Sequence, residues 1–180
     1  MCGISGFVDF NKKSGKNILE KMNRTLHHRG PDGEGYGIFE TDTSITGLGH
    51  RRLSIIDLSE GGSQPKTYKG LHITFNGEIY NYAEIKNSLV SKGHTFNSHS
   101  DTEVILHAYE EWGPAALQQF IGMFAFVIYD ETNKKIFACR DRAGVKPFFY
   151  YYKDGLFLFA SELKALLQHP GFTKEINTDA

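Results

Sequence analysis

Residues 148–160 read Phe-Phe-Tyr-Tyr-Tyr-Lys-Asp-Gly-Leu-Phe-Leu-Phe-Ala. Two aromatic-rich segments, 148–153 and 156–160, flank Asp154-Gly155, a dipeptide typical of a two-residue β-hairpin turn. A hairpin joins antiparallel neighbours, whereas parallel strands need a crossover connection of roughly a dozen residues or more. This stretch therefore predicts a pair of antiparallel strands.

The same reasoning extends to the rest of the chain. Apolar residues at four-residue spacing from Ile18 to Leu26 predict a helix that ends near His28. A second helix is predicted between an Asn81 cap and Gly93. Strand candidates occupy residues 4–10, 36–39, 45–49, 71–75, 123–130 and 135–140.

Two further helices and one loop complete the pattern. Ser100-Asp101-Thr102-Glu103 reads as a capping box for a helix that Gly113-Pro114 ends. Ser161 is predicted to cap a closing helix that runs to Leu167. Residues 29–35 are predicted to be loop, because glycine and proline interrupt them repeatedly. Hairpins dominate, so the fold class is α+β, with antiparallel sheets packed face to face and helices outside.

Composition excludes several classes of protein. The 180 residues suit one domain, and 20 basic against 21 acidic side chains leave a net charge of −1. No run approaches the roughly 18 apolar residues of a membrane span. The two cysteines form no disulfide framework or zinc spacing. We expect a cytoplasmic protein with no nucleic-acid or membrane partner.

The amino terminus, Met1-Cys2-Gly3, carries the first chemical signal. Removal of Met1, which the small side chain of Cys2 permits, would leave a thiol and a free α-amine on one residue. An α-amine has an ordinary pKa of about 7.7–8.0, so part of it can accept a proton near pH 7. Nucleophile and base would then need no separate histidine. The alternative is a small structural cysteine.

Asn76-Gly77-Glu78 is a second polar segment beside an apolar strand. An Asn side chain and the N–H of the next glycine can donate two hydrogen bonds to one developing oxyanion. Asn-Gly is most commonly a tight hairpin turn, and the local sequence by itself favours that turn over an oxyanion hole.

Arg52, Glu78 and Asp101 are candidates for binding an amino acid. An arginine fork matches a carboxylate, although the residues alone favour an ordinary ion pair. Asp101 begins a predicted helix, where the helix dipole favours an acid for structural reasons alone. With Glu78, it would complement an ammonium group.

Metal and phosphate motifs are not found in the sequence. The eight histidines show neither H-E-x-x-H nor a Cys/His ligand spacing, and no P-loop is present. The sequence predicts no metal site.

In series, several motifs resemble the glutaminase domain of class II glutamine amidotransferases, of the asparagine synthetase type. Each match is short, but their order from Cys2 to about Leu167 is specific. They are Cys2-Gly3-Ile4, Arg29-Gly30-Pro31-Asp32, Arg52-Leu53-Ser54-Ile55-Ile56-Asp57, Asn76-Gly77-Glu78-Ile79-Tyr80-Asn81, Ser100-Asp101-Thr102-Glu103, Gly122-Met123-Phe124-Ala125-Phe126, Arg140-Asp141-Arg142, Lys146-Pro147 and Ser161-Glu162.

The resemblance implies a fold and a reaction. The fold is the N-terminal-nucleophile (Ntn) hydrolase αββα four-layer sandwich with two mostly antiparallel sheets. Cys2 would attack the side-chain amide of L-glutamine, with Asn76 and the N–H of Gly77 as the oxyanion hole. A glutamyl thioester would form, and its hydrolysis would complete the release of glutamate and ammonia.

The resemblance also assigns the substrate contacts. They are Arg52 for the α-carboxylate, Glu78 and Asp101 for the α-ammonium, and the backbone around Leu53, Ile55 and Ile56 for the pocket lining.

In that family an ATP-dependent synthetase domain follows, and it is absent from residues 1–180. We expect a chain cut at the domain border, or else a separate synthetase subunit. The glutaminase step needs no cofactor, while ATP and Mg²⁺ belong to the synthetase. Aspartate is the default ammonia acceptor, with another carboxylate left open, and a homodimer is one candidate assembly. The alternative function is a non-catalytic module that senses glutamine or docks a partner.

Overall fold

The computed structural model describes residues 1–53 and 62–175, and in this part of the chain the strands form two antiparallel sheets. In spatial order the first sheet contains β2 (Gly33–Glu40), β3 (Ile45–Arg52), β1 (Gly3–Asp9), β9 (Leu156–Ala160) and β8 (Phe149–Lys153). The second contains β4 (Lys66–Tyr68), β5 (Leu71–Ile79), β6 (Gly122–Asp130) and β7 (Lys135–Arg140). The hairpin predicted at Asp154-Gly155 joins β8 to β9, as expected.

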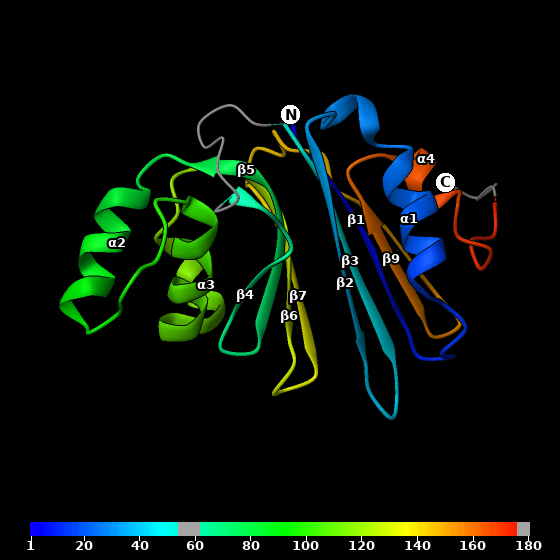
Figure 1. The fold of residues 1–180 in the computed structure, drawn as a ribbon, viewed down its shortest axis with the longest axis horizontal. Helices are drawn as coiled ribbons and strands as arrows, with labels where there is room; N and C mark the ends of the chain where they lie inside the picture. Colours follow the sequence, from blue (N-terminus) through cyan, green and yellow to red (C-terminus); the bar gives the residue numbers. More distant parts are fainter. Residues whose placement is uncertain (54–61, 176–180) are drawn as a thin grey trace.

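Helices cover the outer faces of both sheets (Figure 1). The first sheet carries α1 (Lys16–Arg24) and the short α4 (Leu163–Leu166). The second carries α2 (Tyr82–Ser91) and α3 (Asp101–Trp112). The predicted α+β class and the αββα layering are therefore confirmed. No helix in the described ranges has the length and apolar character needed to cross a membrane.

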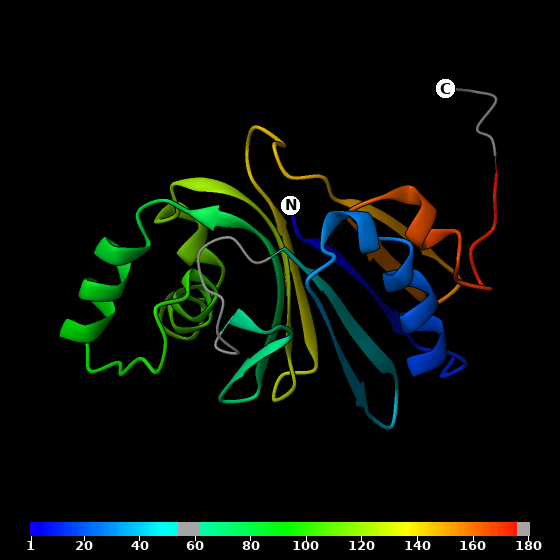
Figure 2. The same cartoon turned by 45° about the horizontal axis from the view of Figure 1, so that its top comes forward.

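Three apolar clusters hold the layers together. One lies between α1, α4 and the first sheet, and a second lies between α2, α3 and the second sheet. A smaller cluster joins the two sheets and contains Leu48, Val127, Tyr129 and Phe159. Figure 2 shows the amino terminus at one end of the two sheets, between them. The layers thus bring the start of β1 close to the second sheet.

The glycine-rich segment after Pro31 differs from the loop that the sequence predicts. Strand β2 already begins at Gly33 and pairs along its length with β3. A Cβ atom on Gly35 would lie only 1.8 Å from the backbone oxygen of Gln64. Glycine therefore serves close packing of β2 against another segment here, rather than a break in the strand.

Strand β5 extends further than predicted and contains Asn76 and Gly77. Asn76 pairs with Ala125 and Gly77 with Phe124 across the β5–β6 ladder. The hairpin-turn interpretation of Asn-Gly is therefore wrong. Glycine is required for close approach, since a Cβ atom at position 77 would lie 2.4 Å from the Met123 oxygen.

The predicted capping box at α3 is only half formed. Ser100 is the N-cap, and its hydroxyl accepts a hydrogen bond from the Thr102 N–H at 3.2 Å. Glu103 does not reach back to Ser100. Its carboxylate accepts the backbone N–H groups of Asn97 and Ser98, at 2.9 and 2.8 Å, and so fixes the segment before the helix.

Ser161 does not cap the closing helix. Its hydroxyl accepts a hydrogen bond from the N–H of Ile4 at 3.0 Å, and α4 begins only at Leu163. Asn81 occupies the N-cap position of α2, but its side chain bonds to the Gln119 oxygen and the Ile121 N–H instead. Both side chains therefore join segments that are distant in sequence.

Candidate functional site

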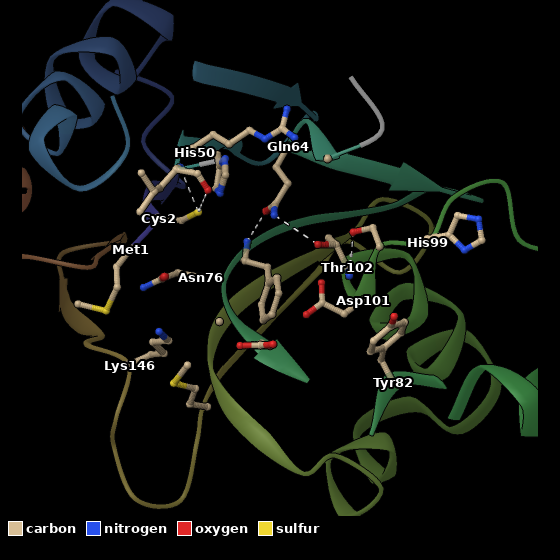
Figure 3. A pocket seen from close by; sticks show the side chains of 18 residues that line it. Met1, Cys2, His50, Gln64, Asn76, Tyr82, His99, Asp101, Thr102 and Lys146 are labelled. Carbon is tan, nitrogen blue, oxygen red and sulfur yellow. Dashed lines mark hydrogen bonds between the residues drawn. The ribbon is translucent and has the colours of Figure 1, made fainter. Parts of the chain in front are cut away.

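One pocket of about 360 Å³ opens at the end of the sheets where the amino terminus lies. Strands β1 and β3 are antiparallel, so the residue before β1 lies beside the end of β3. The carboxyl-terminal half of β5 and the start of α3 form the opposite wall (Figure 3). The predicted site residues that line this pocket are Cys2, Arg52, Leu53, Asn76, Gly77, Glu78 and Asp101. Ile55 and Ile56 lie outside the described residues.

The Cys2 thiol is held against the backbone of Leu53. The Leu53 N–H donates to Sγ at 3.5 Å, and Sγ lies 3.9 Å from the Leu53 oxygen, to which the thiol donates. These two contacts fix the position of the sulfur atom at the wall of the pocket.

A second contact fixes the backbone of Cys2. The Arg29 Nε donates to the Cys2 carbonyl at 3.0 Å, and the Arg29 Nη1 donates to Glu162 at 3.0 Å. Burial opposes ionisation of Glu162, but hydrogen bonds from Arg29, Lys164 and His28 outweigh it and lower the pKa of this carboxyl to about 2. Glu162 is thus ionised at neutral pH and holds Arg29 against the amino terminus.

Asn76 presents an amide donor to the pocket. The residue is 1% exposed, and its Nδ2 has no hydrogen-bond partner among the described residues. Asn76 and Thr74 are two residues apart in β5, so their side chains lie on the same face of the sheet. The Thr74 hydroxyl donates to the Gly49 oxygen in the other sheet. Asn76 therefore faces the first sheet, whose strand β1 directly follows Cys2. An unpaired buried donor costs about 1–3 kcal/mol, which a ligand acceptor would recover.

The N–H of Gly77 lies on the edge of β5 that faces away from β6. Alternate N–H groups of β5 point away from β6, and two of them have side-chain partners. The Phe75 N–H donates to Gln64 at 2.6 Å, and the Ile79 N–H donates to Asp101 at 3.1 Å. Because N–H directions repeat every second residue, the Gly77 N–H lies between these two on the open edge of the strand.

Two acids lie across the pocket from Cys2. Burial raises the pKa of Asp101 above its ordinary value, and the nearby charge of Glu78 adds to the effect. Hydrogen bonds from the N–H groups of Ile79 and Thr102 act in the opposite direction. A pair of acids whose charges repel each other is suited to a cationic ligand group.

Three other residues line the pocket and have no role predicted from the sequence: Gln64, Lys146 and His50. Gln64 joins β5 to the start of α3, since it accepts from the Phe75 N–H and donates to the Thr102 hydroxyl at 3.4 Å. Lys146 is 5% exposed and lines the same pocket as Asn76 (Figure 3). His50 is buried, and its Nε2 has no hydrogen-bond partner in the described part of the chain. Lys146 belongs to the Lys146-Pro147 motif, but no local pattern assigns a role to any of the three, because packing brings them to the pocket.

His50 is a weak base. Burial lowers the pKa of His50 to about 4, and the charge of Arg52 acts in the same direction. A hydrogen bond to the backbone of Phe75 favours the charged form but does not outweigh these two effects. The imidazole is therefore neutral at pH 7 and has little affinity for a proton. No group of three metal-ligating side chains lies at this pocket among the described residues.

Known proteins resemble this chain in both sequence and fold. A family model described as "Glutamine amidotransferase domain" matches residues 1–180. The chain is 44% identical over 188 residues to asparagine synthetase (glutamine-hydrolyzing) 3 of Bacillus subtilis, covering 98% of this chain and 29% of that protein. It is 42% identical over 175 residues to asparagine synthetase (glutamine-hydrolyzing) 1 of the same organism, covering 93% of this chain and 27% of that protein.

A solved structure shares the fold. Glutamine phosphoribosylpyrophosphate amidotransferase from B. subtilis, complexed with ADP and GMP, aligns with a TM-score of 0.73 at 22% identity. The alignment covers 92% of this chain and 43% of that one. The chain therefore spans less than half the length of these relatives.

Proposed function

This chain belongs to the family of glutamine amidotransferase domains, and we propose that it hydrolyses the side-chain amide of L-glutamine through Cys2. One observation carries the proposal. The Cys2 thiol, the Asn76 amide, whose nitrogen has no hydrogen-bond partner among the described residues, and the acid Asp101 line a single pocket, although they come from different layers of the fold. They supply a nucleophile, an oxyanion donor and an anchor for an ammonium group.

The reaction begins once Met1 has been removed. The α-amine of Cys2 takes the thiol proton, and the sulfur attacks the carboxamide carbon of glutamine. The carbonyl oxygen becomes an oxyanion that accepts hydrogen bonds from the Asn76 Nδ2 and the Gly77 N–H. The α-ammonium then returns a proton to the amide nitrogen, the C–N bond breaks, and ammonia leaves a glutamyl thioester.

Water completes the cycle. It attacks the thioester carbon while the α-amine of Cys2 accepts its proton, and the same two donors stabilise the second oxyanion. The C–S bond breaks, the sulfur regains a proton and glutamate is released. In this scheme Arg52 binds the α-carboxylate of the substrate, and Asp101 with Glu78 binds its α-ammonium. The backbone of Leu53 lines the pocket. The contacts predicted at Ile55 and Ile56 fall outside the described residues.

We propose that residues 1–180 form a glutaminase domain whose ammonia serves an asparagine-synthetase-like amidation. ATP and Mg²⁺ would act on a synthetase domain or subunit, with aspartate or another carboxylate as the acceptor. Cys2 and Cys139 are both free thiols, which fits the reducing cytoplasm. The homodimer stays a prediction.

The direct test is covalent labelling with a glutamine analogue that carries an electrophilic group. Intact mass is expected to show one adduct on residue 2 of a chain that lacks Met1. Cys139→Ser should label like the parent, because burial raises the pKa of Cys139 to about 11 and keeps its thiol protonated. Cys2→Ser should not label, and the labelled parent should release no glutamate.

The opposite labelling pattern would contradict this assignment. An adduct that persists in Cys2→Ser, or disappears in Cys139→Ser, would place the reactive thiol elsewhere. Unlabelled parent should convert glutamine to equal amounts of glutamate and ammonia. Saturable glutamine binding without either product would favour the non-catalytic module.

Asp101→Asn is expected to raise the KM for glutamine about 10- to 100-fold at pH 7, since a hydrogen bond to a charged group contributes about 1.5–3 kcal/mol. Burial raises the pKa of Asp101, so its ionised form is lost as pH falls through that raised value. The kcat/KM of the parent should therefore fall as the pH drops through this pKa, and the kcat/KM of Asp101→Asn should not show that fall. Steady-state kinetics against pH measures both effects.

Asp130→Asn is the matched control, because Asp130 ends β6 at the far end of the sheet and its side chain bonds to Asn133. It should keep the parent KM and pH profile. An unchanged KM in Asp101→Asn would remove Asp101 from the substrate site.

A further inference from the structure

Three potential metal ligands meet outside the pocket, where the segment after α2 packs on α3. They are His94, His107 and Glu110, and one ligand atom from each lies within 4.8 Å of the others. The two Nδ1 atoms are 3.0 Å apart, and the Glu110 Oε2 lies 3.7 Å from the His94 Nδ1. The sequence spacing matches no common metal motif, so only the fold reveals the group.

Regular backbone structure fixes each ligand. Helix α2 ends in a Schellman motif in which Gly93 has a φ of 94°. The N–H of Gly93 bonds to the Val90 oxygen at 3.0 Å, and that of His94 bonds to the Leu89 oxygen at 3.1 Å. His107 and Glu110 are three residues apart in α3 and so share one helix face. The ligands are thus held on rigid elements.

The placement of protons favours an ion between the two rings. The His94 Nε2 lies 3.2 Å from a Glu111 carboxylate oxygen and therefore carries a hydrogen. In a neutral pair the His94 Nδ1 must then accept from the His107 Nδ1. This leaves the His107 Nε2 without a hydrogen, 3.9 Å from an oxygen of Glu103. That buried nitrogen has no hydrogen-bond partner among the described residues.

A metal ion between the two rings would give each ring nitrogen a partner. With both Nδ1 atoms as ligands, both Nε2 atoms carry hydrogens that face carboxylates, Glu111 for His94 and Glu103 for His107. A carboxylate behind a ligating histidine is the usual outer-shell arrangement of metal sites, because it fixes the tautomer and raises the basicity of the ring.

The surroundings are consistent with this role. The Glu110 Oε1 bonds to the Lys69 ammonium at 2.6 Å, while its other oxygen faces the histidine pair. The rings of Tyr68 and Phe96 stack on His107, with centroids 3.8 and 4.3 Å away. His107 is fully buried, and the Glu110 side chain is 29% exposed, which leaves a path for an ion and a water ligand.

We propose that His94, His107 and Glu110 bind a divalent transition-metal ion. Two imidazoles and one carboxylate, with a fourth position for water, match Zn²⁺ best. The ion would tie the end of α2 to α3 on the outer layer of the second sheet. The site is separate from the pocket and independent of glutamine hydrolysis.

Zinc titration of the purified chain against a chromophoric chelator tests the site. The parent should bind one Zn²⁺ per chain, and Co²⁺ should give the visible spectrum of a nitrogen- and oxygen-ligated tetrahedral ion. Glu110→Gln and His94→Asn should each weaken zinc binding by at least about 10-fold, since even outer-shell changes cost 10- to 100-fold. The Glu110 side chain is 29% exposed, so Glu110→Gln in particular should keep the fold.

Glu131→Gln is the matched control, because Glu131 bonds to the Nε2 of a single histidine, His72, at 3.1 Å. It should bind zinc like the parent. Three results would overturn the proposal: no saturable binding by the parent, parent-like affinity in both ligand variants, or a thiolate-to-cobalt charge-transfer band, which would place the ion on a cysteine.

Discussion

A chain that keeps Met1 is expected to lose at least about 100-fold in kcat for glutamine hydrolysis. In such a chain the Cys2 nitrogen is part of a peptide bond and cannot accept the thiol proton. General base catalysis contributes typically 10²–10⁴-fold, and His50 cannot replace the amine because its pKa is about 4. The measurement compares two fusions whose protease cleavage leaves either Met1 or Cys2 as the first residue.

This pair of proteins differs by one residue, so differences in folding are small. Glutamate release should be restored when an aminopeptidase removes Met1 from the inactive protein. Cys2→Ala, prepared with the same amino terminus, should stay inactive after that treatment. Equal kcat values for the two cleaved proteins would show that the α-amine is not the base, even if Cys2 is the nucleophile.

Asn76→Ala is expected to lower kcat about 10²- to 10³-fold with little change in KM. Loss of one oxyanion-hole donor has this effect because the hydrogen bond forms mainly with the transition state. The Nδ2 of Asn76 is buried and has no hydrogen-bond partner among the described residues, so the substitution removes a donor without breaking a recorded side-chain hydrogen bond. Steady-state kinetics with glutamine measures the effect.

Thr74→Val is the matched control. Thr74 precedes Asn76 on the same face of β5, and its hydroxyl donates to the Gly49 oxygen at 3.0 Å across the two sheets. Its loss should lower stability, by about 0.5–1.5 kcal/mol for a typical hydrogen bond, and leave kcat unchanged. If Asn76→Ala raised KM and kept the parent kcat, Asn76 would bind the ground state rather than the oxyanion.

Local patterns predict much of this fold. The Asp154-Gly155 turn, the four-residue spacing from Ile18 to Leu26 and the Gly93 stop all correspond to elements of the structure. These signals are readable because turn geometry and helix periodicity depend on residues within a few positions of one another. Cys2, Asn76 and Asp101 can likewise be predicted as candidate site residues from their side-chain chemistry and immediate neighbours.

Where local preference and packing disagree, packing prevails. Gly33 and Gly35 read as loop but lie in β2, and Asn76-Gly77 permits a turn but continues β5. The reason is that neighbouring backbones approach too closely for a side chain at Gly35 and Gly77.

The sequence thus specifies the reactive groups and the antiparallel class, since both depend on residue type and short-range geometry. It does not specify which groups meet. Arg29 reaches Glu162 and the Cys2 carbonyl, and His94 reaches His107, only because strand register and layer packing bring them together. Such contacts depend on long-range burial of apolar surface, which no short window of sequence records.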